Sequence, residues 1–230
     1  MKVSIIIPVY NEEEIISHTL QKLREELKGD YEIVVIDDCS SDNTYYLVKN
    51  MLEDFPNLRL FGNQHKRGFA DTLKIGFDLA SNEIIIPVMA DFCDDVKIIL
   101  QMYNKIIEGY DIVCGSRYVK GGKRAGSHFL KTLLSMGFNK FAHSVTRIPN
   151  TDLTNPFKAY RKCILKKIKL RSKGFEISTE IILKAYYAGC KITELPTVWT
   201  ERHLGKSHFM LFRDGIRFIK IFLFTVLLRV

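Results

Sequence analysis

The sequence predicts an α/β fold, built on a mostly parallel sheet with helices on both faces. Strand-like and helix-like segments alternate through the first half of the chain at the spacing of βαβ units. Three strand-like runs, 5–7, 34–36 and 84–86, are followed by acidic residues, and open α/β sheets hold ligands at the carboxyl ends of parallel strands. With 230 residues, 47% of them apolar, the chain has enough material for the core of one principal domain.

Hydrophobic periodicity and turn residues define the individual elements. Apolar residues within 12–27 recur every three or four positions, which predicts a helix that Gly29 and Asp30 terminate. Residues 40–43 are rich in capping side chains and should start the next helix. In chain order, the predicted strands are 3–9, 32–36, 58–61, 83–88 and 111–114, and the predicted helices are 12–27, 44–52, 69–79 and 95–107.

The two halves of the chain differ in charge. Residues 1–115 contain 11 Lys and Arg against 20 Asp and Glu, whereas residues 116–230 contain 23 against 6. Scattered lysines most often form a solvated surface. Here the basic residues accompany two segments with helical apolar spacing, 129–145 and 209–230, which favours anionic lipid over nucleic acid as a partner. A stripe like that of 129–145 is nevertheless more often core than membrane contact.

The last segment, 209–230, is predicted to be a basic amphipathic helix at a membrane interface, outside a main domain of residues 1–208. Its longest charge-free run is 221–228, which is too short because a membrane span needs about 20 residues. A packing helix, an oligomer contact and the stump of a transmembrane tail are the alternatives.

The cysteines and the N-terminus favour a cytosolic protein. The five cysteines are odd in number, far apart and without a CxxC pair, which argues against a disulfide framework and a zinc site. A short apolar run is interrupted by Pro8 and followed by three glutamates, which is not the order of a signal peptide. We therefore expect a peripheral protein on the cytoplasmic side of a membrane.

Six short motifs in chain order resemble family 2 of the inverting glycosyltransferases. Within it, the resemblance is to the group of dolichyl-phosphate mannose synthases and other polyprenyl-phosphate glycosyltransferases. The motifs are Ser4–Glu13, Ile36–Thr44, Arg67–Ala70, Gly115–Tyr118, Asn155–Arg161 and Phe175–Glu176. The resemblance implies a nucleotide-sugar-binding fold of the GT-A type, a divalent cation (Mg²⁺ or Mn²⁺), and sugar transfer from a GDP- or UDP-sugar to a polyprenyl phosphate.

The donor is expected at the ends of the first two strands. Asp37 and Asp38 follow a strand and can accept hydrogen bonds from a base or a ribose, although turn and cap chemistry is the alternative. Ligand binding and cap chemistry are both possible in this segment if Asp42 caps the helix and Asp38 contacts the ligand. A helix N-terminus next to cations can bind the donor diphosphate. Including those that the resemblance implies, the expected donor-binding residues are Pro8, Tyr10, Glu12, Asp37, Asp38, Lys66, Arg67 and Gly68.

Asp91, Asp94 and Asp95 form the predicted metal cluster. Mg²⁺ and Mn²⁺ prefer hard oxygen ligands and often share them with substrate phosphates, whose departure the cation would stabilise. The usual Asp-Ala-Asp of the family is Met89-Ala90-Asp91 here, so one carboxylate ligand is missing. Capping of the next helix is the alternative role, and it suits Asp94 and Asp95 better than Asp91.

The missing base indicates the acceptor. A hydroxyl acceptor needs a carboxylate or histidine to take its proton, and relatives with such acceptors commonly offer a Glu-Asp pair late in the domain. This chain has Thr151-Asp152-Leu153-Thr154-Asn155 in that neighbourhood and no Glu-Asp pair. A lipid phosphate is already anionic and needs cations instead. The resemblance favours Arg117 and Arg202, so Asp91, Arg117 and Arg202 are the expected catalytic residues. Further cationic candidates are Lys120, Lys123, Arg124 and Lys131.

Two other functions stay open at this point. One is transfer to a saccharide or lipid hydroxyl, with Asp152 as the base. The other is a non-catalytic protein that binds a nucleotide sugar, which Met89 makes conceivable.

Overall fold

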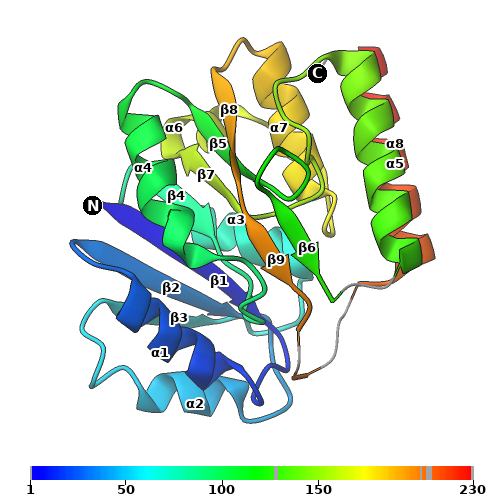
Figure 1. Ribbon diagram of the computed structural model, residues 1–230. Coiled ribbons are helices and arrows are strands. Elements are labelled where there is room, and N and C mark those ends of the chain that lie inside the picture. The colour runs from blue at the N-terminus through cyan, green and yellow to red at the C-terminus, as the bar shows by residue number, and fades with distance from the viewer. Residues whose placement is uncertain (1, 127–128, 203, 206–208, 229–230) are drawn as a thin grey trace.

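The computed structural model describes residues 2–126, 129–202, 204–205 and 209–228, and Figure 1 shows their arrangement. The strands are β1 (Val3–Val9), β2 (Tyr31–Asp37), β3 (Leu58–Gly62), β4 (Ile84–Pro87), β5 (Ile112–Ser116), β6 (Lys123–Ala125), β7 (Lys158–Arg161), β8 (Ile192–Pro196) and β9 (Val198–Thr200). The helices are α1 (Ile16–Glu26), α2 (Thr44–Asn50), α3 (Phe69–Leu79), α4 (Ile99–Ile107), α5 (Phe129–Thr146), α6 (Lys162–Lys167), α7 (Ile177–Tyr187) and α8 (Leu211–Leu228), with a short 3₁₀ helix η1 (Val96–Ile98) before α4.

A seven-stranded sheet in the order β3-β2-β1-β4-β7-β5-β8 forms the centre of the molecule. Strands β1 to β4 pair in parallel, as do β5 and β8, while β7 runs antiparallel between β4 and β5. The predicted mostly parallel sheet is therefore confirmed. From β1 the chain adds β2 and β3 on one side and then β4 on the other, which makes the carboxyl ends of β1 and β4 the expected ligand position.

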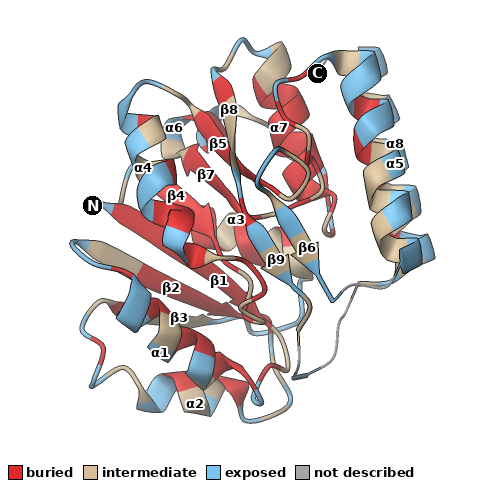
Figure 2. Ribbon diagram, in the orientation of Figure 1, coloured by how far each residue is buried: buried red, intermediate tan, exposed pale blue. Residues whose placement is uncertain are grey.

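Helices cover both faces of the sheet, and each face has its own apolar cluster. One cluster joins Ile5 and Ile7 of β1 to α1 and α4, and the other joins Ile6 of β1 to α3 and α7. All seven residues of β1 are buried, as expected for a parallel strand covered on both sides. Figure 2 shows this buried layer running through the sheet.

The predicted elements of the first half are present, with shifted starts. Residues before Ile16 form a turn in which the Glu12 carbonyl accepts from the N–H groups of Ile15 and Ile16, so α1 begins later than predicted. The helix predicted from residue 95 begins as η1, whose N-cap is Asp95.

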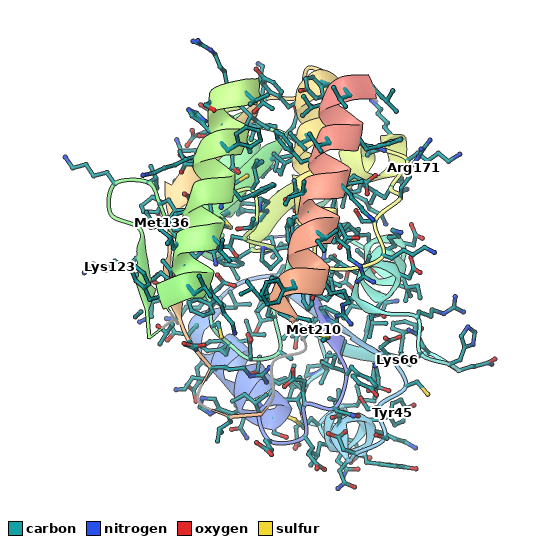
Figure 3. All side chains as sticks on the ribbon, turned by 90° about the vertical axis from the view of Figure 1, so that its right-hand side faces the viewer. Tyr45, Lys66, Lys123, Met136, Arg171 and Met210 are labelled. Carbon is teal, nitrogen blue, oxygen red and sulfur yellow. The ribbon has the colours of Figure 1, made fainter. Side chains whose placement is uncertain are left out.

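Helices α5 and α8 lie at one edge of the molecule (Figure 1) and run side by side there (Figure 3). Phe138 of α5 packs against Phe218 and Phe222 of α8. Phe222 also belongs to the apolar cluster that contains residues of α3 and α7. Both helices carry exposed apolar residues, some of which line the cavity described below. They are Phe129, Leu130, Leu133, Leu134, Phe141 and Val145 of α5, and Phe212, Ile216, Ile219, Leu223, Leu227 and Leu228 of α8. The stripe of 129–145 is thus largely exposed and not core.

Within the described part of the chain, no helix combines the length and apolar character that a membrane crossing requires. The expected boundary at residue 208 lies outside the described residues, and α8 itself begins at Leu211.

Candidate active site

A cavity of about 530 Å³ lies beyond the carboxyl ends of β1, β4 and β5 and extends to α5 and α8. Its lining combines charged side chains with apolar ones. The charged residues include Glu12, Asp91, Asp94, Arg117, Arg124 and Arg202. The apolar residues include Leu134, Phe138, Phe175, Phe209, Phe212 and Ile216. The cavity can therefore take a molecule with an anionic head and a hydrocarbon body.

Asp37, the last residue of β2, has an unsatisfied carboxylate oxygen. Its side chain is 3% exposed, and Oδ2 accepts a hydrogen bond from the Ser40 N–H (3.0 Å). The other oxygen, Oδ1, is buried and has no partner among the described residues. Because buried acceptors are nearly always paired, this oxygen is suited to a ligand that brings its own N–H or O–H.

Asp38 is used differently from Asp37. Its Oδ1 accepts from the Arg67 N–H (2.8 Å) and the Asn63 amide (3.0 Å), and its Oδ2 accepts from the Gly68 N–H (2.8 Å). These bonds fix the turn before α3, where Gly68 has a φ of +92° that favours glycine. Asp38 therefore positions residues 66–68 in this geometry. Asp42 accepts from the Thr44 N–H at 2.9 Å in the turn before α2, but the N-cap residue of that helix is Asn43, so Asp42 lies one residue before the cap position expected for it.

Tyr10 and Lys66 come together from distant parts of the sequence. The Lys66 ammonium lies 3.4 Å from the centroid of the Tyr10 ring, which is a cation–π contact. Tyr10 is partly exposed at the end of β1 and is not a core residue. Pro8, by contrast, is buried within β1 opposite Ile36. Tyr10 and Lys66 thus form an aromatic and cationic surface one residue beyond Val9, which pairs with Asp37 in the sheet.

The predicted metal cluster does not assemble as a group of three. Asp91 lines the cavity and accepts from the Cys93 N–H (3.3 Å). Asp94 also lines it, but it is 5% exposed, and burial raises its pKa to about 7 against the opposing charge of Arg117. Asp95 caps η1 by accepting from the Lys97 N–H (3.1 Å). Met89 lines the cavity where the family's usual motif has a carboxylate.

The donor set at Asp91 fits a divalent cation only in part. Among the described residues there is no group of three or more His, Cys, Asp or Glu side chains placed to hold a metal. Mg²⁺ is commonly held by one or two carboxylates together with substrate phosphates. Asp91 therefore fits such an ion when a diphosphate supplies the remaining oxygens.

Arg117 follows β5 and is held by a bidentate ion pair with Asp152. Its Nε lies 2.7 Å from Asp152 Oδ2 and its Nη2 2.8 Å from Oδ1, while Nη2 also donates to the Thr154 hydroxyl. The Arg117 side chain is 8% exposed and that of Asp152 is fully buried. Burial raises the pKa of Asp152, but the Arg117 guanidinium outweighs it, so the net shift is downward. Asp152 is thus a buried, ionised partner of Arg117 and is not placed to act as a base.

Arg202 brings a late segment of the chain to the end of β1. Its guanidinium pairs with the Glu12 carboxylate, and the Gly205 N–H donates to Glu14 (2.8 Å). Burial raises the pKa of Glu12, and Arg202 opposes that shift. Arg202 therefore places a cation beside Glu12 and close to Asp91.

Several residues at the cavity were not predicted as site residues. Ser135 of α5 bonds the Tyr118 hydroxyl (2.9 Å) and Thr154 (3.2 Å), and Asn155 donates to the Gly115 carbonyl (3.0 Å) and Asp94 (3.4 Å). The motif Asn155–Arg161 was a signal for Asn155, whereas nothing in the local pattern singles out Ser135. Of the cationic candidates, Arg124 and Lys131 line the cavity, while Lys120 and Lys123 are exposed.

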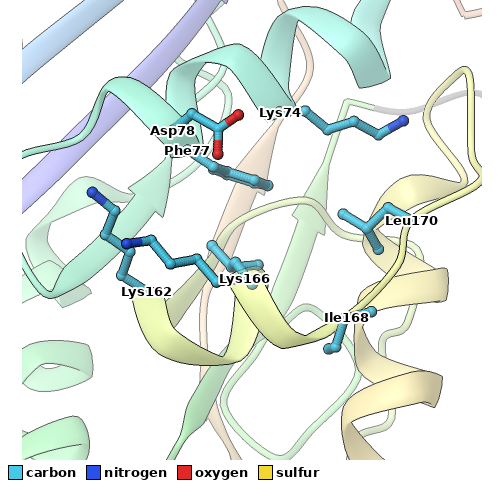
Figure 4. Close-up of a pocket in the computed structure, with 8 residues that line it drawn as sticks. Lys74, Phe77, Asp78, Lys162, Lys166, Ile168 and Leu170 are labelled. Atoms are coloured by element: carbon cyan, nitrogen blue, oxygen red, sulfur yellow. The ribbon is translucent and has the colours of Figure 1, made fainter.

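A second cavity, of about 190 Å³, lies between α3 and α6 (Figure 4). It is lined by Lys74, Lys162 and Lys166 over an apolar floor. The Lys74 ammonium donates to Asp71 and to the Ser172 carbonyl, and that of Lys162 donates to the Ala80 carbonyl. Two of its three ammonium groups are therefore already used within the fold.

The sequence is similar to those of known glycosyltransferases. The family model described as glycosyl transferase family 2 matches residues 4–169. The chain is 35% identical to a dolichol-phosphate mannosyltransferase of Pyrococcus furiosus over 214 residues, which is 90% of this chain and 59% of that protein. It is 28% identical to a polyprenol monophosphomannose synthase of Mycolicibacterium smegmatis over 88% of this chain and 79% of the relative. The chain thus spans less than two thirds of the Pyrococcus protein.

Solved structures show the same fold. A glucosyl-3-phosphoglycerate synthase from Mycobacterium tuberculosis, in complex with Mn²⁺, UDP and phosphoglyceric acid, superposes with a TM-score of 0.74 at 14% identity. The match covers 98% of this chain and 78% of that one. S. aureus TarS, residues 1–349, in complex with UDP, gives a TM-score of 0.62 at 22% identity and covers 97% of this chain and 65% of the other. These likenesses confirm the GT-A fold.

Proposed function

The chain belongs to glycosyl transferase family 2, and from that premise we propose that it transfers a sugar from a nucleotide donor to a polyprenyl phosphate. The observation that carries the proposal is the lining of the cavity, which combines Asp91, Arg117 and Arg202 with apolar residues of α5 and α8. The names of the relatives, which are mannosyltransferases of dolichol and polyprenol phosphates, support the same acceptor class.

The donor half of the site is assigned to the ends of β1 and β2. Asp37 Oδ1 accepts an N–H of the base, and Tyr10 with Lys66 packs against the base or ribose. Asp38 supports this contact indirectly, by holding the turn of residues 66–68 next to the donor diphosphate. Pro8 contributes the buried strand end, and Glu12 holds Arg202 near the donor. A GDP-sugar and a UDP-sugar both present such an N–H.

Asp37→Asn should weaken binding of the donor nucleotide by about 10- to 100-fold, because a hydrogen bond to a charged group contributes about 1.5–3 kcal/mol. Isothermal calorimetry with GDP and UDP measures the change. Asp42→Asn is the matched control, since asparagine accepts the same turn hydrogen bond from a backbone N–H two residues on, and its nucleotide affinity should equal that of the wild type. Equal affinity of the Asp37 variant and the control would refute the assignment.

Asp91 is the residue proposed to hold the divalent cation, together with the donor diphosphate. Asp94 lines the same cavity. A bound Mg²⁺ or Mn²⁺ would supply positive charge that stabilises the diphosphate as it leaves. Asp95 is assigned to the cap of η1 and not to this site.

Arg117 and Arg202 are proposed to orient the two anionic reactants. A phosphate oxygen of the acceptor attacks the anomeric carbon, the bond to the nucleoside diphosphate breaks, and the configuration inverts. The acceptor phosphate needs no base, in agreement with the complete engagement of Asp152 by Arg117. Positive charge from Arg117 offsets the repulsion between the acceptor phosphate and the donor diphosphate.

The exposed apolar sides of α5 and α8 are proposed to lie in a membrane interface on its cytoplasmic face. Both helices also carry basic residues, which suit anionic headgroups. They include Lys131 and Lys140 of α5 and Arg213 and Lys220 of α8. This extends the interfacial segment from 209–230 to include α5. The hydrocarbon tail of the acceptor would then enter the cavity from the membrane.

Phe212→Glu should lower binding to vesicles that contain anionic lipid by about 10- to 100-fold, because burial of a Phe side chain contributes about 1.5–3 kcal/mol. Phe212 is 82% exposed, so the fold should not change. Ile107→Glu, at an exposed position of α4 distant from both helices, is the control in a vesicle sedimentation assay. A similar loss in both variants, or in neither, would count against this surface.

The proposed function is tested directly by incubation with a panel of GDP- and UDP-sugars, Mn²⁺ and a short polyprenyl phosphate. Mass spectrometry should detect the polyprenyl phosphate sugar, and NMR of the purified product should show the anomeric configuration opposite to that of the donor. Nucleotide binding without any transfer across the panel would favour the non-catalytic alternative that Met89 suggests.

A further inference from the structure

Lys158, the first residue of β7, has its side chain fully buried. Its ammonium donates to the backbone carbonyls of Asp152 and Leu153 at 3.3 Å each, and to that of Asn155. Burial lowers the pKa of Lys158, and the nearby Asp152 carboxylate opposes that shift. Taking an ammonium out of water costs several kcal/mol, so its place here needs an explanation beyond the filling of space.

The three carbonyls belong to one short segment, residues 152–155, that supports two side chains of the site. At one end, Asp152 holds Arg117 through Nε, Nη2 and the backbone N–H. At the other end, Asn155 connects Asp94 to the Gly115 carbonyl. The Lys158 ammonium therefore holds the backbone carbonyls of the segment that carries both the Asp152–Arg117 and the Asn155–Asp94 contacts.

The orientation of Arg117 depends closely on this segment. Guanidinium donors form a rigid planar fork, so the carboxylate that engages one edge determines where the other edge points. Among the described residues, Asp152 and Thr154 engage Nε and Nη2, which leaves Nη1 as the edge to offer to a phosphate. A shift of the Asp152 backbone would rotate that edge.

We propose that Lys158 is a positioning residue, which acts through residues 152–155 to aim the Arg117 guanidinium at the acceptor phosphate. This inference rests on the proposed function, in which Arg117 meets that phosphate. It also gives the motif Asn155–Arg161 a role. Its first residue, Asn155, donates to Asp94, and its fourth, Lys158, positions Arg117 through the backbone of residues 152–155.

Lys184 provides a matched control for a buried ammonium. Its side chain is 6% exposed, pairs with Glu180 (3.0 Å) and donates to the Lys169 carbonyl (2.6 Å). It lies on α7 and does not line the cavity of the candidate site. Lys158→Met and Lys184→Met therefore remove the same buried group in two places, only one of which supports Arg117.

The test compares these two variants with the wild type in four measurements. They are urea unfolding, nucleotide affinity by calorimetry, kcat and KM for a short polyprenyl phosphate, and the Arg117 Nε–H signal in ¹⁵N-resolved NMR. Lys158→Met should raise the acceptor KM at least about tenfold, because one misdirected charged hydrogen bond contributes about 1.5–3 kcal/mol. It should keep nucleotide affinity within about twofold and shift or broaden the Arg117 signal, while Lys184→Met should change neither KM nor the signal.

An unchanged acceptor KM and Arg117 signal in Lys158→Met would overturn the proposal, and so would equal effects in both variants. Loss of cooperative unfolding in Lys158→Met and in Lys158→Gln would also overturn it, because Lys158 would then serve the fold and not the site. The NMR signal needs no turnover, so it tests the inference even if the wild type transfers no sugar. That last result would refute the proposed function alone.

Discussion

Asp91→Asn should reduce sugar transfer by about 10²- to 10³-fold in kcat, the loss typical when one group that stabilises developing charge is removed. Asp91 is the carboxylate proposed to hold a cation against the departing diphosphate, and asparagine keeps its size but removes its charge. Transfer of labelled sugar to a short polyprenyl phosphate, measured at saturating Mn²⁺, gives the rate.

Asp95→Asn is the control for this prediction, because Asp95 caps η1 and asparagine is an equally good cap. Its kcat should remain within about twofold of the wild type, since exchanges of good caps cost only a few tenths of a kcal/mol. If Asp91→Asn keeps full activity, or if the control loses as much, Asp91 is not the residue that supports departure of the diphosphate.

Arg117→Gln should lower kcat/KM for the acceptor by about 10²- to 10³-fold and leave nucleotide affinity nearly unchanged. Arg117 is the proposed partner of the acceptor phosphate, whereas Asp37 and Tyr10 form the donor side. The variant also leaves the buried Asp152 carboxylate without its partner, which should destabilise the fold by about 3–5 kcal/mol. Steady-state kinetics and urea unfolding separate the two effects.

The double variant Arg117→Gln, Asp152→Asn isolates the catalytic effect from the structural one. Removing both charges should recover much of the lost stability, since no uncompensated buried charge remains. Activity should not recover, because the cation that meets the acceptor phosphate is still absent. Recovery of activity together with stability would show that Arg117 serves only to hold Asp152.

The sequence was sufficient to place the strand-end acids, because local patterns determine them. Apolar runs that end in Asp37 and Asp91 predict parallel strands and a ligand edge, and the structure has β2 and β4 there. The distinction between Asp37 and Asp38 was not predictable. It depends on the turn before α3, whose N–H groups reach Asp38 from 29 and 30 residues away.

Long-range pairings account for the other features that the sequence did not reveal. Asp152 resembled a possible base in the sequence, but its ion pair with Arg117 joins residues 35 apart and removes it from that role. Arg202 and Glu12 meet across 190 residues. The stripe of α5 has the spacing of a core helix, and only its position at the molecular edge beside α8 exposes it.

In the proposed function, one cavity brings a nucleotide donor at Asp91 together with a lipid phosphate at Arg117. A crystal structure with a nucleoside diphosphate, Mn²⁺ and a short polyprenyl phosphate tests it most directly. We expect the base against Asp37, the diphosphate and Mn²⁺ beside Asp91, the acceptor phosphate on Arg117 and the hydrocarbon between α5 and α8. An acceptor phosphate bound away from Arg117, or a nucleotide with no metal near Asp91, would contradict it.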